Sequence, residues 1–138
     1  MTIYFINSFI VASAVLIHYE MLLKLSTIIP GLRMWHRYRV LVGIFGALVA
    51  HVAEIWLFAF GYYFMILSDK FGTLKGNFSG DLLDCVYFSF VTYSSLGLGD
   101  IYPIGDLRFL TGLEVLTGLV LITWTASFMF LEMQKFWK

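Results

Sequence analysis

Three long runs of apolar residues divide the chain, at about residues 3–25, 40–67 and 109–131. A helix needs roughly 20 apolar residues to cross a hydrocarbon core of about 30 Å, because each residue adds about 1.5 Å. Each run is long enough, so the pattern predicts three membrane-spanning helices. A fourth run, at residues 82–93, predicts a helix of roughly 18 Å, which is too short to span.

The composition agrees with a chain whose solvent is lipid. Of 138 residues, 60% are hydrophobic and 13% are charged, and the mean hydropathy is +0.85, whereas soluble domains are about 45–50% apolar and about 25% charged. A soluble domain is excluded, and we expect a multi-pass integral protein of the cell membrane. The net charge is zero, so no nucleic-acid partner is indicated. For the single cysteine, Cys85, we expect a free buried thiol rather than a link between subunits.

Basic residues are distributed unevenly between the predicted helices. They follow the first helix and recur in the C-terminal tail, at Lys24, Arg33, Arg37, Arg39, Lys135 and Lys138. Residues 68–106 hold two lysines but five aspartates. Because cytoplasmic loops carry the excess of Lys and Arg, we predict an N-terminus outside the cell and a cytoplasmic C-terminus. We expect His18 and Glu20, near the cytoplasmic end of the first helix, to lie close to the basic loop of residues 24–39.

The segment after the short helix is rich in glycine and polar groups. It reads Thr-Tyr-Ser-Ser-Leu-Gly-Leu-Gly-Asp-Ile-Tyr-Pro over positions 92–103. Gly97 and Gly99 permit backbone angles that residues with a Cβ avoid, so successive carbonyl oxygens can face one side. At membrane depth, such a backbone is tolerated only where it is buried in protein or lines a water-filled cavity. A row of carbonyl oxygens replaces the water shell of a dehydrated cation, so the segment predicts a cation pathway.

Residues 88–100, Phe-Ser-Phe-Val-Thr-Tyr-Ser-Ser-Leu-Gly-Leu-Gly-Asp, resemble the pore helix and selectivity filter of the potassium channel superfamily. They are particularly similar to the second pore loops of two-pore-domain potassium channels. The resemblance covers an outer helix at 40–67, a pore helix at 82–93, a filter at 95–99 and an inner helix at 109–131. It implies a pore domain over residues 40–138, preceded over residues 1–39 by a transmembrane helix and a basic cytoplasmic linker.

The resemblance also implies a role for each residue of the loop. The residues implied to form the filter are Ser95, Leu96, Gly97, Leu98 and Gly99, with potassium ions at the first four, and those implied to support it are Thr92, Ser94 and Asp100. Asp100 is expected to brace the filter by hydrogen bonding towards the pore helix. No cofactor is implied apart from the permeant potassium ions.

The number of chains follows from the geometry of such a filter. One filter strand offers one carbonyl per level, so a cage of eight oxygens around an ion requires four strands. We therefore predict an all-α membrane protein with three transmembrane helices and one re-entrant pore helix per chain. It assembles as a homotetramer, with three identical subunits and membrane lipid as partners. Its expected function is passive potassium conduction, without enzyme activity.

Two residues depart from the commonest filter of that superfamily. Ser95 replaces threonine and keeps the hydroxyl, whereas Leu98 replaces tyrosine and loses the hydroxyl that anchors it to the pore helix. Potassium selectivity is the favoured interpretation because the backbone carbonyls remain. Two alternatives stay open, namely a non-selective monovalent cation channel and an accessory subunit that does not conduct.

Three ionisable residues fall inside the predicted spans. His51 and Glu54 are three apart and share one face of the second helix, and Glu114 lies in the last helix. Such groups cost about 2.5–3.5 kcal/mol at membrane depth, so they are expected to face protein and to have partners. One hypothesis is a pH-responsive network behind the filter, with Glu114 approaching Thr92 or Tyr93. The other is a static hydrogen-bonded cluster.

Other functions for these residues are less well supported. His51 and Glu54 offer ligand types for a metal, but two ligands do not complete a site. A membrane-embedded enzyme that uses these two residues and Glu114 leaves the filter-like loop unexplained. Gly118 in the last helix is open to two interpretations, a gating hinge or close helix packing.

Overall fold

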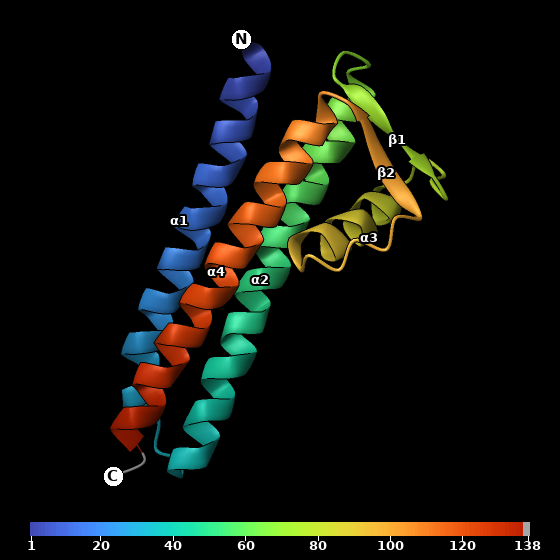
Figure 1. The fold of residues 1–138 in the computed structure, drawn as a ribbon. Coiled ribbons are helices and arrows are strands. Elements are labelled where there is room, and N and C mark those ends of the chain that lie inside the picture. The colour runs from blue at the N-terminus through green and yellow to red at the C-terminus, as the bar shows by residue number, and fades with distance from the viewer. Residues whose placement is uncertain (137–138) are drawn as a thin grey trace.

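The structure is a computed structural model that describes residues 1–136, except for the side chains of residues 36 and 136. In chain order, its elements are α1 (Thr2–Gly31), α2 (His36–Leu67), β1 (Gly72–Gly76), α3 (Leu82–Tyr93), β2 (Ile101–Gly105) and α4 (Leu107–Phe136). In Figure 1, α1, α2 and α4 run side by side along the molecule, and α3 and the two strands lie beside one half of this bundle. Lys138, part of the charge pattern above, lies outside the described residues.

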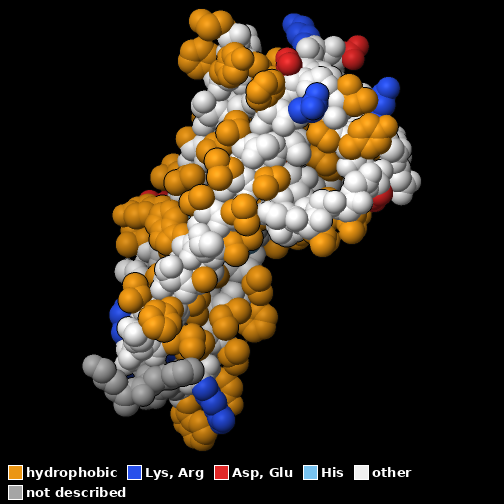
Figure 2. All heavy atoms as spheres, in the orientation of Figure 1, with side chains coloured by type: hydrophobic (Ala, Val, Ile, Leu, Met, Phe, Trp, Pro, Cys, Tyr) orange, Lys and Arg blue, Asp and Glu red, His pale blue; other side chains and the backbone are white. Residues whose placement is uncertain are grey.

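The three long helices are the predicted membrane spans. Each is long and apolar enough to cross a bilayer, and α3 has the bounds that the fourth apolar run predicts. Hydrophobic side chains cover much of the face along the long helices in Figure 2, while Lys and Arg lie near the two ends. The expectation of an all-α membrane protein, with a small sheet added, is therefore confirmed.

The connection between α1 and α2 is much shorter than the predicted basic loop. α1 continues through Pro30 to Gly31, because Leu22, Leu25 and Ile29 extend its buried stripe. Leu32 then adopts an extended conformation. The guanidinium of Arg39 donates to the Leu32 carbonyl oxygen from Nε and Nη2, at 3.1 and 2.7 Å, and fastens this turn. Most of residues 24–39 are therefore helical.

A two-stranded antiparallel sheet, which the sequence analysis did not predict, flanks α3. Gly72 pairs with Gly105 and Gly76 pairs with Ile101. A Cβ at Gly76 would lie 2.1 Å from the carbonyl oxygen of Asp100, so only glycine permits this approach. Since β2 begins directly after Asp100, the sheet fixes the end of the glycine-rich loop.

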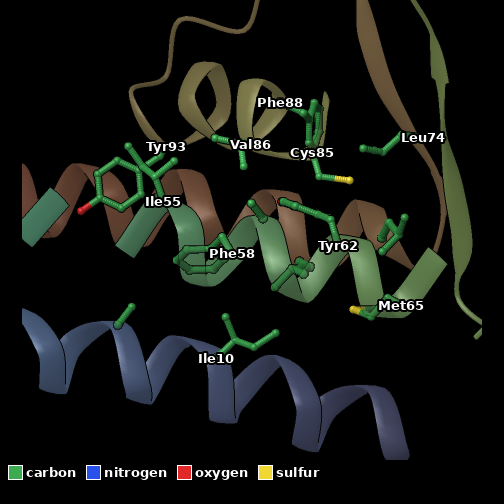
Figure 3. Packing of buried hydrophobic residues seen from close by; sticks show 14 of the residues in the cluster. Ile10, Ile55, Phe58, Tyr62, Met65, Leu74, Cys85, Val86, Phe88 and Tyr93 are labelled. Carbon is green, nitrogen blue, oxygen red and sulfur yellow. The ribbon is translucent and has the colours of Figure 1, made fainter. Parts of the chain in front are cut away.

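The main core lies where α3 meets the long helices. Figure 3 shows Phe58 and Tyr62 of α2 between α3 and α1, with Ile10 approaching from α1 and Phe88 from α3. The rings of Tyr62 and Phe88 meet edge to face, with centroids 5.1 Å apart. Cys85 is buried here as a free thiol, as expected.

Candidate functional site

The start of α3 is fixed by an acidic side chain in its first turn. Both the backbone N–H and the hydroxyl of Ser79 donate to Asp84 Oδ2, at 2.7 and 2.6 Å. These hydrogen bonds favour the carboxylate and hold the pKa of Asp84 below its usual value. A negative charge at this end is also favourable to the helix dipole. The local sequence thus sets where α3 begins and hence where the loop after it starts.

The predicted filter leaves α3 through a turn and adopts an alternating backbone. Ser95 N–H donates to the Thr92 carbonyl at 3.0 Å, and Gly97 N–H donates to the Val91 carbonyl at 2.9 Å. The φ angles of Ser95, Gly97 and Gly99 are +62°, +53° and +81°. Ser95 thus occupies a region that costs a residue with a Cβ about 1–2 kcal/mol. Left-handed residues at alternate positions are what the glycine spacing predicts.

In a single chain, the loop is open to its surroundings. Residues 94–100 are all exposed, and the side chains of Leu96 and Leu98 are 62% and 61% accessible. Leu98 therefore does not pack into the core as the tyrosine that it replaces would be expected to do. The loop is held at its two ends, by α3 and by β2, and presents its middle outwards.

Asp100 is hydrogen-bonded to α3 and to the residue that follows β1. The hydroxyl of Tyr87 on α3 donates to Asp100 Oδ2 at 2.9 Å, and Asn77 N–H donates to the Asp100 carbonyl at 2.8 Å. The bond to the carboxylate favours the protonated phenol and raises the pKa of Tyr87. The resemblance implies a bond from Asp100 towards the pore helix, and the structure supplies Tyr87 as the partner, which the sequence alone did not identify.

Glu114 is completely buried, and its contacts differ from those hypothesised. The Tyr62 hydroxyl donates to Glu114 Oε2 at 2.5 Å, and Ser89 Oγ lies 2.5 Å from Oε1. The expected approach of Glu114 to Thr92 or Tyr93 is therefore wrong, because Ser89 lies one turn earlier in α3. Gly118, one turn further along α4, is the residue that meets Tyr93, since a Cβ there would lie 2.2 Å from the Tyr93 carbonyl oxygen. Of the two interpretations of Gly118, the structure thus supports close packing.

A count of hydrogens indicates the protonation state of Glu114. Ser89 Oγ lies 2.8 Å from the Ile55 carbonyl oxygen as well as 2.5 Å from Glu114 Oε1. The serine has only one hydrogen to donate. Both contacts are satisfied when Ser89 donates to Ile55 and a protonated Glu114 donates to Ser89. A neutral carboxyl also suits a buried position at membrane depth.

A second buried network, which we call the polar cluster, joins all four helices. It comprises His18 of α1, His51 and Glu54 of α2, Tyr93 of α3 and Thr125 of α4. Glu54 Oε1 lies 2.8 Å from His18 Nδ1, and Glu54 Oε2 lies 3.2 Å from His51 Nδ1. The prediction that His51 and Glu54 share a face and have partners is confirmed.

Tyr93 connects the polar cluster to the glycine-rich loop after α3. Its ring extends from the end of α3 towards α2 and α4 in Figure 3, and its hydroxyl donates to Glu54 Oε2 and lies 2.9 Å from His51 Nδ1. The backbone of Tyr93 is two residues before Ser95. One side chain therefore links Glu54 to the start of the glycine-rich loop.

His18 was misplaced by the sequence analysis, which expected it beside the basic loop. The structure buries it completely against Glu54, near the middle of α1. One signal could have found His18: like His51, it is a histidine within an apolar span. Thr125 and Ser89 were also missed, because a Ser or Thr hydroxyl in an apolar helix commonly bonds its own backbone and carries no signal of its own. Tyr62 was missed as well.

Comparison with known proteins identifies the family to which the chain belongs. A family model described as "ion channel" matches residues 38–135, from the start of α2 almost to the end of α4. The chain belongs to this ion channel family. The match is consistent with a pore module of the potassium channel superfamily, and this ion channel family is not an enzyme family. No characterised protein and no solved structure matches the chain. With three apolar helices, the chain is an integral membrane ion channel.

Proposed function

We propose that this ion channel conducts potassium selectively through a filter formed by residues 95–99. The observation that carries the proposal is the alternating left-handed backbone at Ser95, Gly97 and Gly99, directly after a half-length helix. That backbone supports a row of carbonyl oxygens along one side, which replaces the water shell of a dehydrated cation. The resemblance to potassium channel filters assigns the ion sites to Ser95, Leu96, Gly97 and Leu98.

Four copies of the chain surround the pathway in this proposal. The exposed middle of the loop supports it, because polar backbone at membrane depth needs protein or water beside it. Around a common axis, four loops give the eight oxygens that enclose an ion. With α3 as a re-entrant pore helix, its C-terminal end, which carries about half a negative charge, favours a cation in the central cavity.

The chain is placed in the cell membrane with its N-terminus outside. The basic side chains around the α1–α2 turn and at Lys135 then lie on the cytoplasmic side, in keeping with the positive-inside rule. On this orientation, α3 enters from the outer face, and Thr92, Ser94 and Asp100 support the filter. Potassium moves down its electrochemical gradient without a chemical reaction.

The Tyr87–Asp100 bond favours potassium selectivity over a non-selective pore. Leu98 cannot anchor the filter through a hydroxyl, but Asp100 is still held to α3 at 2.9 Å. The other candidate, a non-selective cation channel, rests on the 61% exposure of Leu98, which leaves that level of the loop without side-chain packing in a single chain.

Reconstitution into a planar bilayer with opposed potassium and sodium gradients tests the proposal. A reversal potential near the potassium equilibrium value supports a selective filter. A reversal potential near zero, with robust current that barium blocks, supports the non-selective pore. Silence over a range of pH, voltage and membrane tension contradicts conduction and supports the accessory subunit.

A further inference from the structure

The polar cluster contains three groups of the kinds that bind transition metals. His18, His51 and Glu54 each offer one ligand atom within 4.8 Å of the others. His18 Nδ1 lies 2.8 Å from Glu54 Oε1, and His51 Nδ1 lies 3.2 Å from Glu54 Oε2. The second separation is close to the roughly 3.3 Å between neighbouring ligands of a tetrahedral zinc ion with bonds of about 2.0–2.1 Å, and the first is shorter. The sequence provided two of these ligands, and the fold adds the third from α1.

Thr125 is placed as an outer partner for both imidazoles. Its Oγ1 lies 3.2 Å from His18 Nε2 and 2.9 Å from His51 Nε2. A histidine that binds a metal through one nitrogen donates the N–H of the other to a nearby acceptor. When both Nδ1 atoms bind an ion, both Nε2–H groups donate to Thr125, whose oxygen has two lone pairs.

Charge and burial also favour a cation at this position. His18 and Glu54 are completely buried, and a carboxylate at such depth needs compensation by positive charge. The Tyr93 hydroxyl, 2.9 Å from His51 Nδ1, lies on the same side as the ligand atoms and can fill or adjoin a fourth position. Magnesium and calcium prefer sites made only of oxygen, whereas imidazole suits zinc.

We propose that His18, His51 and Glu54 form a zinc-binding site between α1 and α2, with Thr125 as the outer partner of both histidines. The bound ion fastens α1 to α2 and, through the Tyr93 hydroxyl, to the end of the pore helix. Binding itself does not depend on the proposed potassium selectivity. Only the consequence for gating rests on that function, through the position of Tyr93 two residues before Ser95.

The test measures metal binding to the full chain in detergent, without any ion flux. The protein is produced with an affinity tag that lacks histidine, stripped with a chelator and titrated with zinc by calorimetry, and its metal content is measured by mass spectrometry. Cobalt, loaded in parallel, reports a tetrahedral site through its visible absorption. The chain has three histidines, so His36→Gln, fifteen residues before His51 in α2, is the matched control.

We expect one zinc ion per chain in the wild type and in His36→Gln, and no measurable binding in His18→Gln or Glu54→Gln. Thr125→Val keeps all three ligands, so it shows the role of the outer partner even where a ligand variant fails to fold. The expected loss of zinc affinity for Thr125→Val is about 10–100-fold.

Two results overturn the zinc site. One is a folded wild-type chain that binds neither zinc nor cobalt, in which case the cluster is a hydrogen-bonded network that holds a proton. The other is binding that is unchanged in Thr125→Val and in the folded ligand variants, which places the metal elsewhere. Because binding is read without ion flux, a failure here is distinguishable from a failure of potassium conduction.

Discussion

Gly118 sets how closely α4 approaches the end of α3. A Cβ at this position would lie 2.2 Å from the Tyr93 carbonyl oxygen and 3.1 Å from the Tyr93 ring. The nearest obstacle is backbone, which cannot rotate away as a side chain does. Tyr93 also carries the hydroxyl that bonds Glu54, so we expect a displacement at this point to affect both the polar cluster and the proposed filter.

We expect Gly118→Ala to lower the free energy of unfolding by about 1–3 kcal/mol, because it overpacks this contact, and to reduce ion flux from liposomes. Gly112→Ala is the matched control, since a Cβ there meets nothing within 4 Å in the same helix. There, the alanine is expected to be neutral or to stabilise the helix by up to about 1 kcal/mol. Equal effects of the two substitutions on thermal unfolding in detergent would contradict the packing role of Gly118.

Glu114 is the residue at which a static cluster and a pH sensor can be separated. If its carboxyl is protonated, as the Ser89 contacts indicate, glutamine preserves a donor towards Ser89 and an acceptor for Tyr62. We expect Glu114→Gln to change stability by less than about 1 kcal/mol and to leave the pH dependence of the current unaltered. Glu114→Ala leaves both hydroxyls without this partner, at about 1–3 kcal/mol for each buried group. A pH profile that shifts in Glu114→Gln identifies the carboxyl as a sensor.

At the scale of elements, α3, the loop and β2 form one unit that is held at several points. Ser79 fixes the start of α3 through Asp84, and Tyr87 holds Asp100 at the far end of the loop. The pairing of β1 with β2 at Gly76 keeps the backbone of Asp100 in place. The unit depends on these polar contacts because residues 94–100 are exposed in a single chain.

Tyr87→Phe removes the bond to Asp100 while keeping the ring. This bond lies at an exposed position, where solvent screens it, so its contribution to the stability of the chain is small. We expect the potassium-to-sodium permeability ratio to fall, by up to about tenfold, with little change in chain stability. Tyr102→Phe, at an exposed tyrosine of β2, controls for the loss of a hydroxyl near the outer end. An unchanged reversal potential in Tyr87→Phe would show that Asp100 does not support the filter through this bond.

The sequence predicts these elements to very different degrees. The spans and α3 follow from apolar run length, because a bilayer demands about 20 residues and twelve cannot cross it. The strands were not predicted, since each has only five residues, with glycine at both ends of β1 and at one end of β2, and such short segments carry little alternation. The partner of Glu54 was missed because His18 is 36 positions away and meets it only through helix packing. For Glu114, the predicted partners lie one turn further along α3 than the observed partner Ser89. Which turn of α3 faces Glu114 depends on how α4 is aligned along α3, and the sequence does not show that alignment.

At the scale of the whole molecule, α1 is an integral part of the channel chain although the family match begins at residue 38. Its buried face packs on α2 and α4, and His18 completes the polar cluster beneath Tyr93. The described part of the chain is thus a single packed bundle in which the helix outside the match contacts Glu54, the residue that bonds Tyr93 at the end of α3.

The predicted tetramer has a thermodynamic consequence that needs no current measurement. If four chains enclose the ion sites at residues 95–99, potassium binds the assembly and not the separated chains. Mass action then stabilises the tetramer, by about 2.7 kcal/mol when the ion concentration is 100 times its dissociation constant. We expect native mass spectrometry to give four chains of 15.8 kDa each, and the thermal midpoint of the tetramer to rise when potassium replaces a large organic cation.

The same measurement in sodium distinguishes a potassium-selective channel from a non-selective one. Sodium is expected to leave the thermal midpoint unchanged if the filter is selective and to raise it if the filter is non-selective. A stable monomer with full conductance after reconstitution, or a midpoint that responds to neither ion, would contradict the tetrameric filter.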